Sequence, residues 1–332
     1  MEKKSEPLPE IAVDVSPCVR IYKDGSVERL VGTATVPPGP SADGHVVSKD
    51  VTLDADTGLF VRLYMPLCVD KGTQDPKVPV VVYIHGGGFC VETAASPIYH
   101  SYLNLVANEC KVLCVSVNYR RTPEHRLPAA YDDCLSVLEW IDGHGGAGAR
   151  EGLDPWIKSH ADLGRCFVAG DSAGGNIVHQ TGVKASGRNW RHLRLEGAIV
   201  VHPFFGGEEA IACERADTAE AQGLVRLGDE LWKISLPEGA DKDHPFCNPD
   251  GPRSTSLATL PYSRIIVFVA EKDLIKDRGV MYYEALKKAG KEVQLVVTQS
   301  EGHVFYLLNP QSENAPPMLN QISNFIHSSD SL

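Results

Sequence analysis

The chain has 332 residues, of which 43% are hydrophobic and 23% charged, and its formal net charge at pH 7 is −11. This apolar content is enough for a large core and excludes a disordered chain, while the acidic balance argues against nucleic acids and anionic membranes, whose binding requires a basic patch. No stretch reaches the roughly 18 to 20 apolar residues that cross a bilayer, so we expect a soluble globular protein.

The amino-terminal sequence and the cysteines predict a compartment. The first residues, MEKKSEPLPE, are polar and lack the apolar stretch of a signal peptide. The nine cysteines form no C-x-x-C pair, which suits a reducing compartment better than a disulfide framework. We therefore expect a cytoplasmic protein, with the nucleus as a second location.

From about Val46 onward, strand-like and helix-like segments alternate, which predicts a largely parallel sheet covered by helices. Several strand candidates are continuous β-branched runs such as VPVVVYI, as expected for strands buried on both faces. The expected strands are Val46–Leu53, Phe60–Met65, Val78–Ile84, Val112–Val117, Cys166–Ala169, Gly197–Val201, Arg264–Val269 and Val293–Val297. The expected helices are Tyr99–Asn108, Ala129–Ile141, Gly175–Ala185, Arg278–Ala289 and Met318–His327.

Two regions interrupt the alternation. Residues 1–45 are rich in Pro, Gly and charge, and contain CVRIYKDGSVERL, whose DG pair predicts a hairpin turn. Residues 204–262 have a weak helical pattern, with Gly206, Gly207, Pro237, Pro245, Pro249 and Pro252 around it. So long an insertion between core strands is usually functional. We interpret residues 1–45 as an amino-terminal cap segment and 204–262 as a cap insertion over a core of 46–203 and 263–332. Surface decoration without a role is the alternative.

The strongest motif is Gly170-Asp171-Ser172-Ala173-Gly174, which matches the G-x-S-x-G nucleophile elbow. A predicted strand precedes it and a predicted helix start follows it, which is the context that the elbow requires. Glycines beside Ser172 allow the strained turn, and the helix amino terminus favours developing negative charge. We predict Ser172 as the nucleophile, and a glycine-rich helix cap is the alternative.

A second motif, His85-Gly86-Gly87-Gly88-Phe89, follows the buried strand VVVYI. Successive glycines leave backbone N–H groups uncovered, and in hydrolases with an HGGG loop these join the N–H of the residue after the nucleophile to form an oxyanion hole. We predict Gly87, Gly88 and Ala173 as the donors. A phosphate-binding loop is disfavoured because no Lys-Ser/Thr pair follows and the G-x-G-x-x-G spacing is absent.

The order Ser, then Asp or Glu, then His after successive strands selects the remaining partners. Asp273 follows the strand run SRIIVFVAE, and Asp277 is the alternative acid four residues later. His303 follows the strand EVQLVVT through a short loop, whereas His179 and His202 fit satisfied core or surface histidines better. His303 would then take the proton of Ser172 while Asp273 orients the imidazole. This chemistry needs no metal or other cofactor, and the sequence contains no H-E-x-x-H motif.

The combination of HGGGF, NYRRTPEHRLPAAYDD and GDSAGGNIVH resembles the hormone-sensitive-lipase-like family. The segments SPCVRIYKDGSVERL, DHPFCNP, AEKDLIKDRG and EGHVFYL are similar to its plant carboxylesterase branch, which includes gibberellin receptors, strigolactone-cleaving and hypersensitivity-related esterases and isoflavone-pathway dehydratases. The similarity runs from about Pro17 to Ile326. It implies the α/β-hydrolase fold, with a mostly parallel twisted sheet, flanking helices and a cap.

Differences within that family bear on function. The resembling receptors lack the catalytic histidine, which His303 supplies here, and the dehydratases carry threonine where this chain has Ser172. We therefore expect a serine carboxylesterase acting on a small, fairly apolar ester, such as a hormone, xenobiotic or specialised metabolite. A repurposed lyase, cyclase or acyltransferase and a non-catalytic hormone receptor are the alternatives. Candidate pocket residues are Phe89, Phe204, Phe205, Trp232 and Phe305, and nothing in the sequence marks an oligomer interface.

Overall fold

The structure, a computed structural model, describes residues 10–67, 77–143 and 152–328. Residues 1–9, which carry most of the polar amino terminus, lie outside the described residues, as do parts of the predicted core (68–76, 144–151 and 329–332). No helix within the described ranges is long and apolar enough to cross a membrane.

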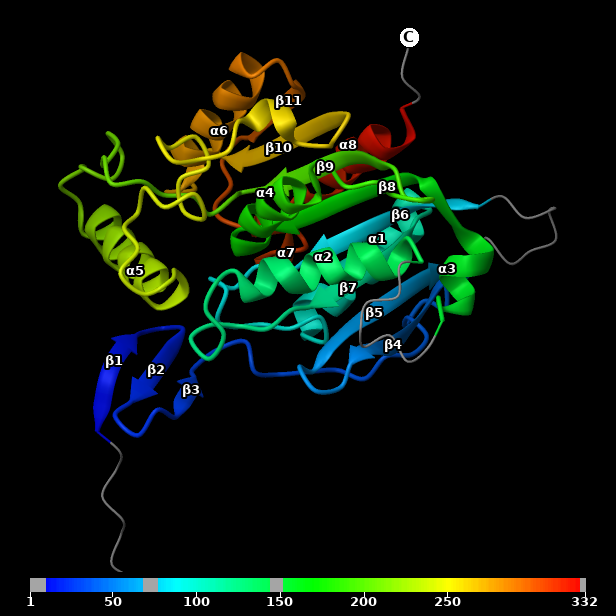
Figure 1. Ribbon diagram of the computed structural model, residues 1–332, viewed down its shortest axis with the longest axis horizontal. Coiled ribbons are helices and arrows are strands. Elements are labelled where there is room, and N and C mark those ends of the chain that lie inside the picture. The colour runs from blue at the N-terminus through cyan, green and yellow to red at the C-terminus, as the bar shows by residue number, and fades with distance from the viewer. Residues whose placement is uncertain (1–9, 68–76, 144–151, 329–332) are drawn as a thin grey trace, which may run out of the picture.

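An eight-stranded sheet forms the centre of the described structure, in the order β11-β10-β9-β8-β6-β7-β5-β4 (Figure 1). Its strands are β4 (Val46–Asp54), β5 (Leu59–Pro66), β6 (Val78–Ile84), β7 (Leu113–Asn118), β8 (Ala161–Asp171), β9 (Leu195–Val201), β10 (Arg264–Ala270) and β11 (Glu292–Thr298). Neighbours from β7 to β11 are parallel, whereas β5 runs antiparallel to both β7 and β4. All eight predicted strands are present, and every residue of β6, β9 and β10 is buried.

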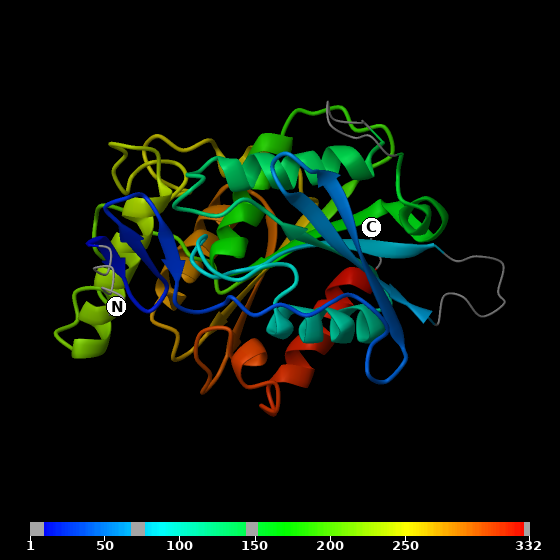
Figure 2. The ribbon, with the colours of Figure 1, turned by 90° about the horizontal axis from the view of Figure 1, so that it is seen from below.

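Helices cover both faces of this sheet, so its strands are buried on both sides. The helices are α1 (Pro97–Cys110), α2 (Ala129–Ile141), α3 (Pro155–His160), α4 (Ala173–Ala185), α5 (Ala219–Ser235), α6 (Lys276–Lys288), α7 (Phe305–Leu308) and α8 (Ala315–His327). Buried residues of α1, α7 and α8 form one hydrophobic cluster, and those of α2, α4 and α6 belong to another. Figure 2 shows α1 and α8 together below the sheet and α2 and α4 above it.

Four of the five predicted helices begin two or three residues earlier than the apolar periodicity indicated, as α1 and α8 illustrate. Proline occupies the first turn of both, at Pro97 and Pro316. Proline is favoured there because its missing N–H would have no partner in any case, but it adds nothing to an apolar pattern. Helices α3, α5 and α7 were not predicted as helices, since their patterns are short or weak.

The amino-terminal segment forms a separate antiparallel sheet of β1 (Ile11–Val15), β2 (Val19–Tyr22) and β3 (Val27–Arg29). The predicted DG turn connects β2 and β3, and Gly25 has φ 86°, a left-handed conformation that glycine adopts without strain. Helix α5 contacts β1, and Figure 1 shows this small sheet and α5 at the same end of the molecule. The division into core and cap remains our proposal.

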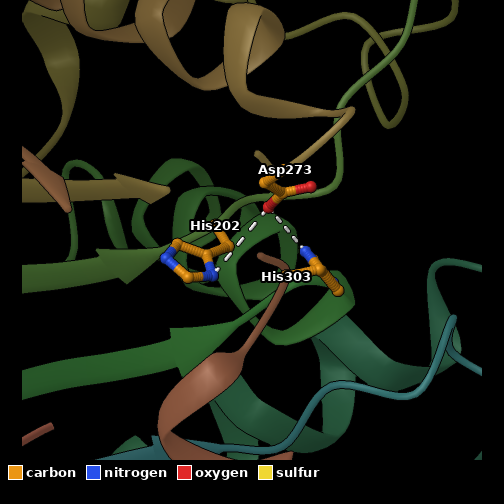
Figure 3. A group of neighbouring side chains, drawn as sticks. All are labelled: His202, Asp273 and His303. Atoms are coloured by element: carbon orange, nitrogen blue, oxygen red, sulfur yellow. Dashed lines mark hydrogen bonds and ion pairs between the residues drawn. The ribbon is translucent and has the colours of Figure 1, made fainter. Parts of the chain in front are cut away.

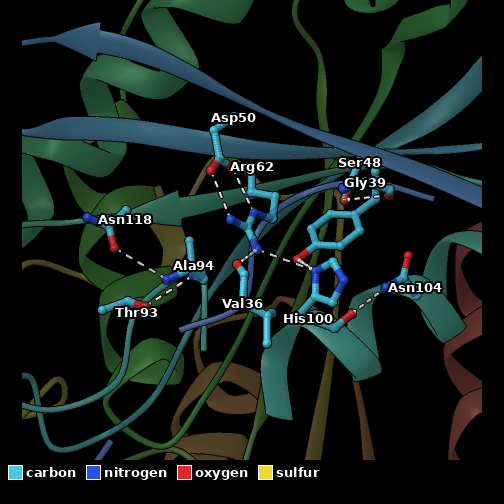
Figure 4. A network of polar contacts seen from close by, with 12 residues as sticks. Val36, Gly39, Ser48, Asp50, Arg62, Thr93, Ala94, His100, Asn104 and Asn118 are labelled. Atoms are coloured by element: carbon cyan, nitrogen blue, oxygen red, sulfur yellow. Dashed lines mark hydrogen bonds and ion pairs between the residues drawn. The ribbon is translucent and has the colours of Figure 1, made fainter. Parts of the chain in front are cut away.

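A buried arginine binds the segment that connects the small sheet to the central sheet (Figure 4). Arg62 on β5 is 1% exposed, and its guanidinium donates to both carboxylate oxygens of Asp50 on β4, at 2.6 and 2.8 Å. It also donates to the carbonyl oxygen of Val36, at 2.9 Å. Because the bidentate pair fixes the orientation of the guanidinium, its third bond ties the segment that contains Val36 to β5.

Candidate active site

Ser172 lies at a sharp turn between β8 and α4, as the elbow motif predicts. Its φ of 54° and ψ of −120° fall in a region that non-glycine residues rarely adopt. A Cβ on Gly174 would lie 2.1 Å from the carbonyl oxygen of Ile84, and one on Gly170 would lie 2.7 Å from the same atom. Only glycine therefore fits at either position, and this close approach brings the elbow against the end of β6.

The structure brings together the three side chains predicted to act on the substrate. Ser172 Oγ lies 3.0 Å from His303 Nε2, and His303 Nδ1 lies 2.7 Å from Asp273 Oδ2. The other oxygen of Asp273 accepts the N–H of Ile275, at 3.1 Å. Figure 3 shows that Asp273 and His303 come from neighbouring loops at the same sheet edge. The arrangement can move a proton from the serine hydroxyl to the imidazole.

Charge around His303 suits it to act as a base. Burial by itself would lower the pKa of His303, but its hydrogen bond to Asp273 and the attraction of Asp273 and Asp171 outweigh burial and raise that pKa above its usual value. Burial likewise opposes ionisation of Asp273, yet the contact with His303 leaves the pKa of Asp273 below its usual range. The pair therefore favours an ionised carboxylate beside an imidazole that binds a proton readily.

Of the alternative partners, Asp277 and His179 lie elsewhere. Asp277 is in the first turn of α6, and its ion pair is with Lys276. His179 lies in α4, where its Nδ1 is 3.0 Å from the hydroxyl of Tyr282, and burial lowers its pKa to about 3. His202 does lie beside the triad, with its ring centroid 5.8 Å from that of His303. The sequence predicted His202 as a satisfied core or surface histidine, because nothing in its spacing links it to the loop after β11.

The glycine loop after β6 faces Ser172. Gly87 and Gly88 have φ values of 95° and 57°, and a Cβ on Gly87 would lie 2.4 Å from the carbonyl oxygen of Val91. The hydrogen bonds of the described residues leave the N–H groups of Gly87, Gly88 and Ala173 without a protein acceptor. Both glycines and Ser172 line the same cavity. These donors are thus available for an oxygen that develops negative charge.

Asp171, the residue before Ser172, is connected to this loop through hydrogen bonds. Its side chain is 1% exposed and accepts hydrogen bonds from the hydroxyls of Tyr83 and Tyr99, at 2.7 and 2.9 Å. The Tyr99 hydroxyl in turn accepts the N–H of Gly86, at 2.8 Å. Burial raises the pKa of Asp171 to about 6, against the lowering effect of the two tyrosines. The elbow pattern allows any residue at this position, so the sequence alone does not single out Asp171.

A cavity of about 410 Å³ opens beside Ser172, Asp273 and His303. Its wall is mainly apolar, and the charged side chains of Glu92 and Lys272 also reach it. The apolar residues on the wall include Val91, Ile98, Phe204, Leu224, Leu227, Leu231, Leu274, Ile275, Val304, Leu307 and Leu308. Helix α5 of the insertion supplies the leucines at 224, 227 and 231, which the weak helical pattern did not single out.

Of the five aromatic residues predicted for the pocket, Phe204 alone is among the cavity-lining residues. Phe204 stacks on Trp232 with ring centroids 4.7 Å apart, and Phe89 packs against Trp232 at 5.4 Å. Phe205 and Phe305 are also buried among other rings, away from the wall. Four of the five rings are thus not among the lining residues, whereas six leucines are.

The group His202, Asp273 and His303 contains three metal-ligating side chains whose donor atoms lie within 4.8 Å of one another. These atoms already serve in hydrogen bonds, because His303 donates to Asp273 and His202 Nδ1 accepts the N–H of Val304. The donor set therefore does not fit a resident metal ion, and no second group of this kind occurs in the described part of the chain.

Comparisons with known proteins identify the family and the fold. A family model described as alpha/beta hydrolase fold matches residues 81–307, and a carboxylesterase family model matches residues 32–123. "Probable carboxylesterase 13" of Arabidopsis thaliana is 38% identical over 96% of this chain and 98% of its own length. An esterase structure from Pyrobaculum calidifontis matches with a TM-score of 0.68 and 25% identity, over 84% of each chain.

Two further plant relatives differ in their named activities. "Tuliposide A-converting enzyme 1, chloroplastic" of Tulipa gesneriana is 41% identical over 96% of this chain and 78% of the relative. "2-hydroxyisoflavanone dehydratase" of Glycyrrhiza echinata is 35% identical over 96% of both chains. The likeness therefore covers nearly the whole chain but extends to more than one reaction type.

The tulip relative also corrects the expected location. Its name describes it as chloroplastic, and the name of another tulip relative, also at 41% identity, describes that protein as amyloplastic. These names contradict the cytoplasmic or nuclear location predicted from the sequence. Unpaired cysteines indicate a reducing environment without saying which compartment provides it. A polar amino terminus argues only against a secretory signal.

Proposed function

Since the chain belongs to the α/β-hydrolase fold family and is of the plant carboxylesterase type, we propose that it is a serine carboxylesterase. The observation that carries this proposal is the chain of contacts from Ser172 Oγ to His303, at 3.0 Å, and on to Asp273, at 2.7 Å. In this proposal Ser172 is the nucleophile, His303 the general base and Asp273 the group that orients the imidazole.

The reaction has two stages. Ser172 Oγ attacks the ester carbonyl while its proton moves to His303 Nε2, and the carbonyl oxygen becomes an oxyanion beside the N–H groups of Gly87, Gly88 and Ala173. His303 then gives its proton to the leaving alcohol, which leaves an acyl group on Ser172. A water molecule, deprotonated by His303, attacks the acyl group and releases the acid. Loss of one oxyanion donor typically costs about 10²- to 10³-fold in kcat.

The cavity supports a small, fairly apolar ester as the substrate. Its volume of about 410 Å³ falls within the range of small-molecule sites, about 300 to 1,000 Å³. Leucines of α5 and α7, together with Leu274, are among the apolar residues that line it. Binding would therefore come mainly from apolar contact, and the oxyanion donors would orient the carbonyl.

A series of p-nitrophenyl esters of increasing acyl length tests the proposal. The wild type is expected to hydrolyse short esters, and Ser172→Ala to lower kcat by several orders of magnitude, since loss of a triad serine elsewhere costs on the order of 10⁶. Ser136→Ala, which removes a surface hydroxyl on α2, serves as the matched control. A folded wild type inert on every ester, or a fully active Ser172→Ala, would contradict the proposal.

A lyase is the second candidate, because a dehydratase is 35% identical over 96% of both chains. Such a reaction would use His303 to remove a proton from the substrate and would leave no acyl group on Ser172. Product analysis separates the two reactions, because hydrolysis releases an acid and an alcohol, whereas elimination of water releases neither. An unsaturated product from an ester-free substrate, formed equally well by Ser172→Ala, would favour the lyase.

A further inference from the structure

We propose that His202 is a positioning residue for His303: its Nδ1 accepts the N–H of Val304 and thereby fixes the backbone that directs the imidazole of His303 at Ser172. The inference rests on the proposed function, because it concerns how that base is held. It gives a role to a buried histidine that the proton-transfer steps do not use.

The backbone of His202 is tied to the sheet and to the elbow. His202 follows β9, and its N–H donates to the carbonyl oxygen of Phe268 on β10, at 2.8 Å. The neighbouring Val201 carbonyl accepts the N–H of Ser172, at 2.9 Å, and the Ser172 carbonyl accepts the N–H of Phe204, also at 2.9 Å. The segment that carries His202 is thus fixed relative to the nucleophile by its own hydrogen bonds.

The side chain of His202 extends from this fixed segment to the loop after β11. It is 1% exposed, and its Nδ1 accepts the N–H of Val304, at 2.9 Å. Val304 directly follows His303 and has φ 44°, a left-handed conformation that a β-branched residue adopts only with strain. A strained residue persists only where its surroundings hold it, and the hydrogen bond from its N–H to His202 is such a restraint.

His202 must be neutral to accept this hydrogen bond. Burial lowers the pKa of His202 to about 3, and repulsion by His303 adds to this effect against the attraction of Asp273. The proton of the neutral ring is then on Nε2. Asp273 Oδ2 lies 3.9 Å from His202 Nδ1 but 2.7 Å from His303 Nδ1. His202 therefore does not compete with His303 for the carboxylate (Figure 3).

The competing explanation is that the His202 ring only fills space. It lies against the rings of Phe305 and Tyr306, with centroids 6.1 and 6.2 Å away. A space-filling role depends on ring volume, whereas the positioning role depends on an acceptor at the place of Nδ1. Substitutions that vary these two properties separately can therefore distinguish the roles.

Three substitutions do so. His202→Asn puts an amide oxygen where Nδ1 was, and asparagine tolerates the positive φ of 44° at this position. His202→Gly also accepts that φ but has no acceptor. His202→Gln keeps more of the ring volume, but its amide lies one bond further out, near the position of Nε2. Circular dichroism and thermal melts check that each variant is folded.

We expect His202→Gly and His202→Gln to lower kcat on the order of 10²-fold if His303 moves by about 1 Å. We expect little change in KM. We expect His202→Asn to remain close to the wild type. The pH profile of kcat/KM gives the second readout: a His303 that aligns poorly with Asp273 loses part of its raised pKa, so the acidic limb moves to lower pH. Asp273, Asp171 and His202 are the titratable groups that face His303, and Tyr306 also faces His202.

Three results would overturn the inference: full activity in all variants, equal losses in His202→Asn and His202→Gly, or a fall in kcat without a shift of the acidic limb. If His202→Gly does not fold, the comparison of His202→Asn with His202→Gln still decides. An inert folded wild type would instead contradict the proposed esterase reaction. In that case the rate at which an organophosphonate labels Ser172 would compare the variants without substrate turnover.

Discussion

At the scale of single residues, the site holds two carboxylates whose pKa values are shifted in opposite directions. Asp273 is buried beside a histidine that gains charge, so its pKa is low, whereas Asp171 is buried among tyrosine hydroxyls and its pKa is about 6. In the proposed reaction, the first carboxylate would stabilise the imidazolium that forms on His303. The second holds the glycine loop through Tyr99 and carries an energetic cost once it ionises.

That cost predicts a pH-dependent effect of Asp171→Asn on stability. The folded-state pKa of about 6 lies above the unfolded value of about 3.9, so Asp171 favours the folded state at low pH and this contribution is lost as pH rises to about 6. Two pKa units correspond to about 3 kcal/mol. Relative to the wild type, Asp171→Asn should therefore gain about this much stability between pH 4 and pH 7. Denaturant melts at both pH values measure it, and an unchanged difference would contradict the assignment.

The raised pKa of His303 predicts the acidic limb of catalysis. Because His303 must be neutral to accept the serine proton, kcat/KM should fall as pH drops through a pKa above the ordinary value of about 6.5. Asp273→Asn removes the main source of the raised pKa, so it should shift the limb to lower pH and lower kcat by on the order of 10⁴. Asp277→Asn is the matched control, and a larger loss there would assign the acid to Asp277.

At the scale of elements, local sequence was sufficient to predict the strands and both glycine turns. The β-branched runs of β6, β9 and β10 are buried on both faces, so their composition alone marks them. The elbow and the HGGG loop were predictable because each needs glycine at fixed positions. Helix α5 was missed because Gly223 and Gly228 interrupt its sequence, and glycine is a poor helix former.

The leucines of α5 predict control of substrate size. Leu227→Trp adds volume to the cavity wall, so long acyl chains should bind less well while short ones still react. In the p-nitrophenyl ester series, KM should rise for the longer esters and kcat for the shortest should stay near the wild-type value. Gln222→Trp places the same ring on an exposed position of α5 and should leave the series unchanged. Equal profiles for both variants would contradict a lining role for Leu227.

At the scale of the whole molecule, contacts distant in sequence complete the site. Ser172, Asp273 and His303 could be assigned from motif order, but the contact between His202 and Val304 joins segments 102 residues apart. The cavity likewise combines Cys18 of the small sheet with α5 and the loops after β6, β10 and β11. No local sequence pattern indicates which distant segments meet beside Ser172. Most of the residues that line the cavity therefore could not be predicted.

Arg29 links the small sheet to the loop after the predicted oxyanion donors. Its guanidinium donates to the carbonyl oxygen of Cys90, at 2.7 Å, and to both carboxylate oxygens of Glu124, at 2.8 Å each. Arg29→Met removes these charge-assisted bonds and should raise KM more than it lowers kcat. Arg20→Met removes an exposed pair of the same sheet and should have little effect. Equal kinetics for both variants would contradict a cap that depends on Arg29.

The most direct test of the central claim is to locate the acyl group on the enzyme. A p-nitrophenyl carbamate transfers its carbamoyl group to the nucleophile of serine hydrolases, and the enzyme hydrolyses this group only slowly. Intact-mass and peptide-mass measurements can therefore locate the carbamoyl group while residual esterase activity is assayed. Our account predicts one carbamoyl group per chain, on Ser172, with activity lost in proportion to labelling and no label in Ser172→Ala. Full esterase activity in a chain completely carbamoylated at Ser172, or inactivation with the label on another residue, would contradict it.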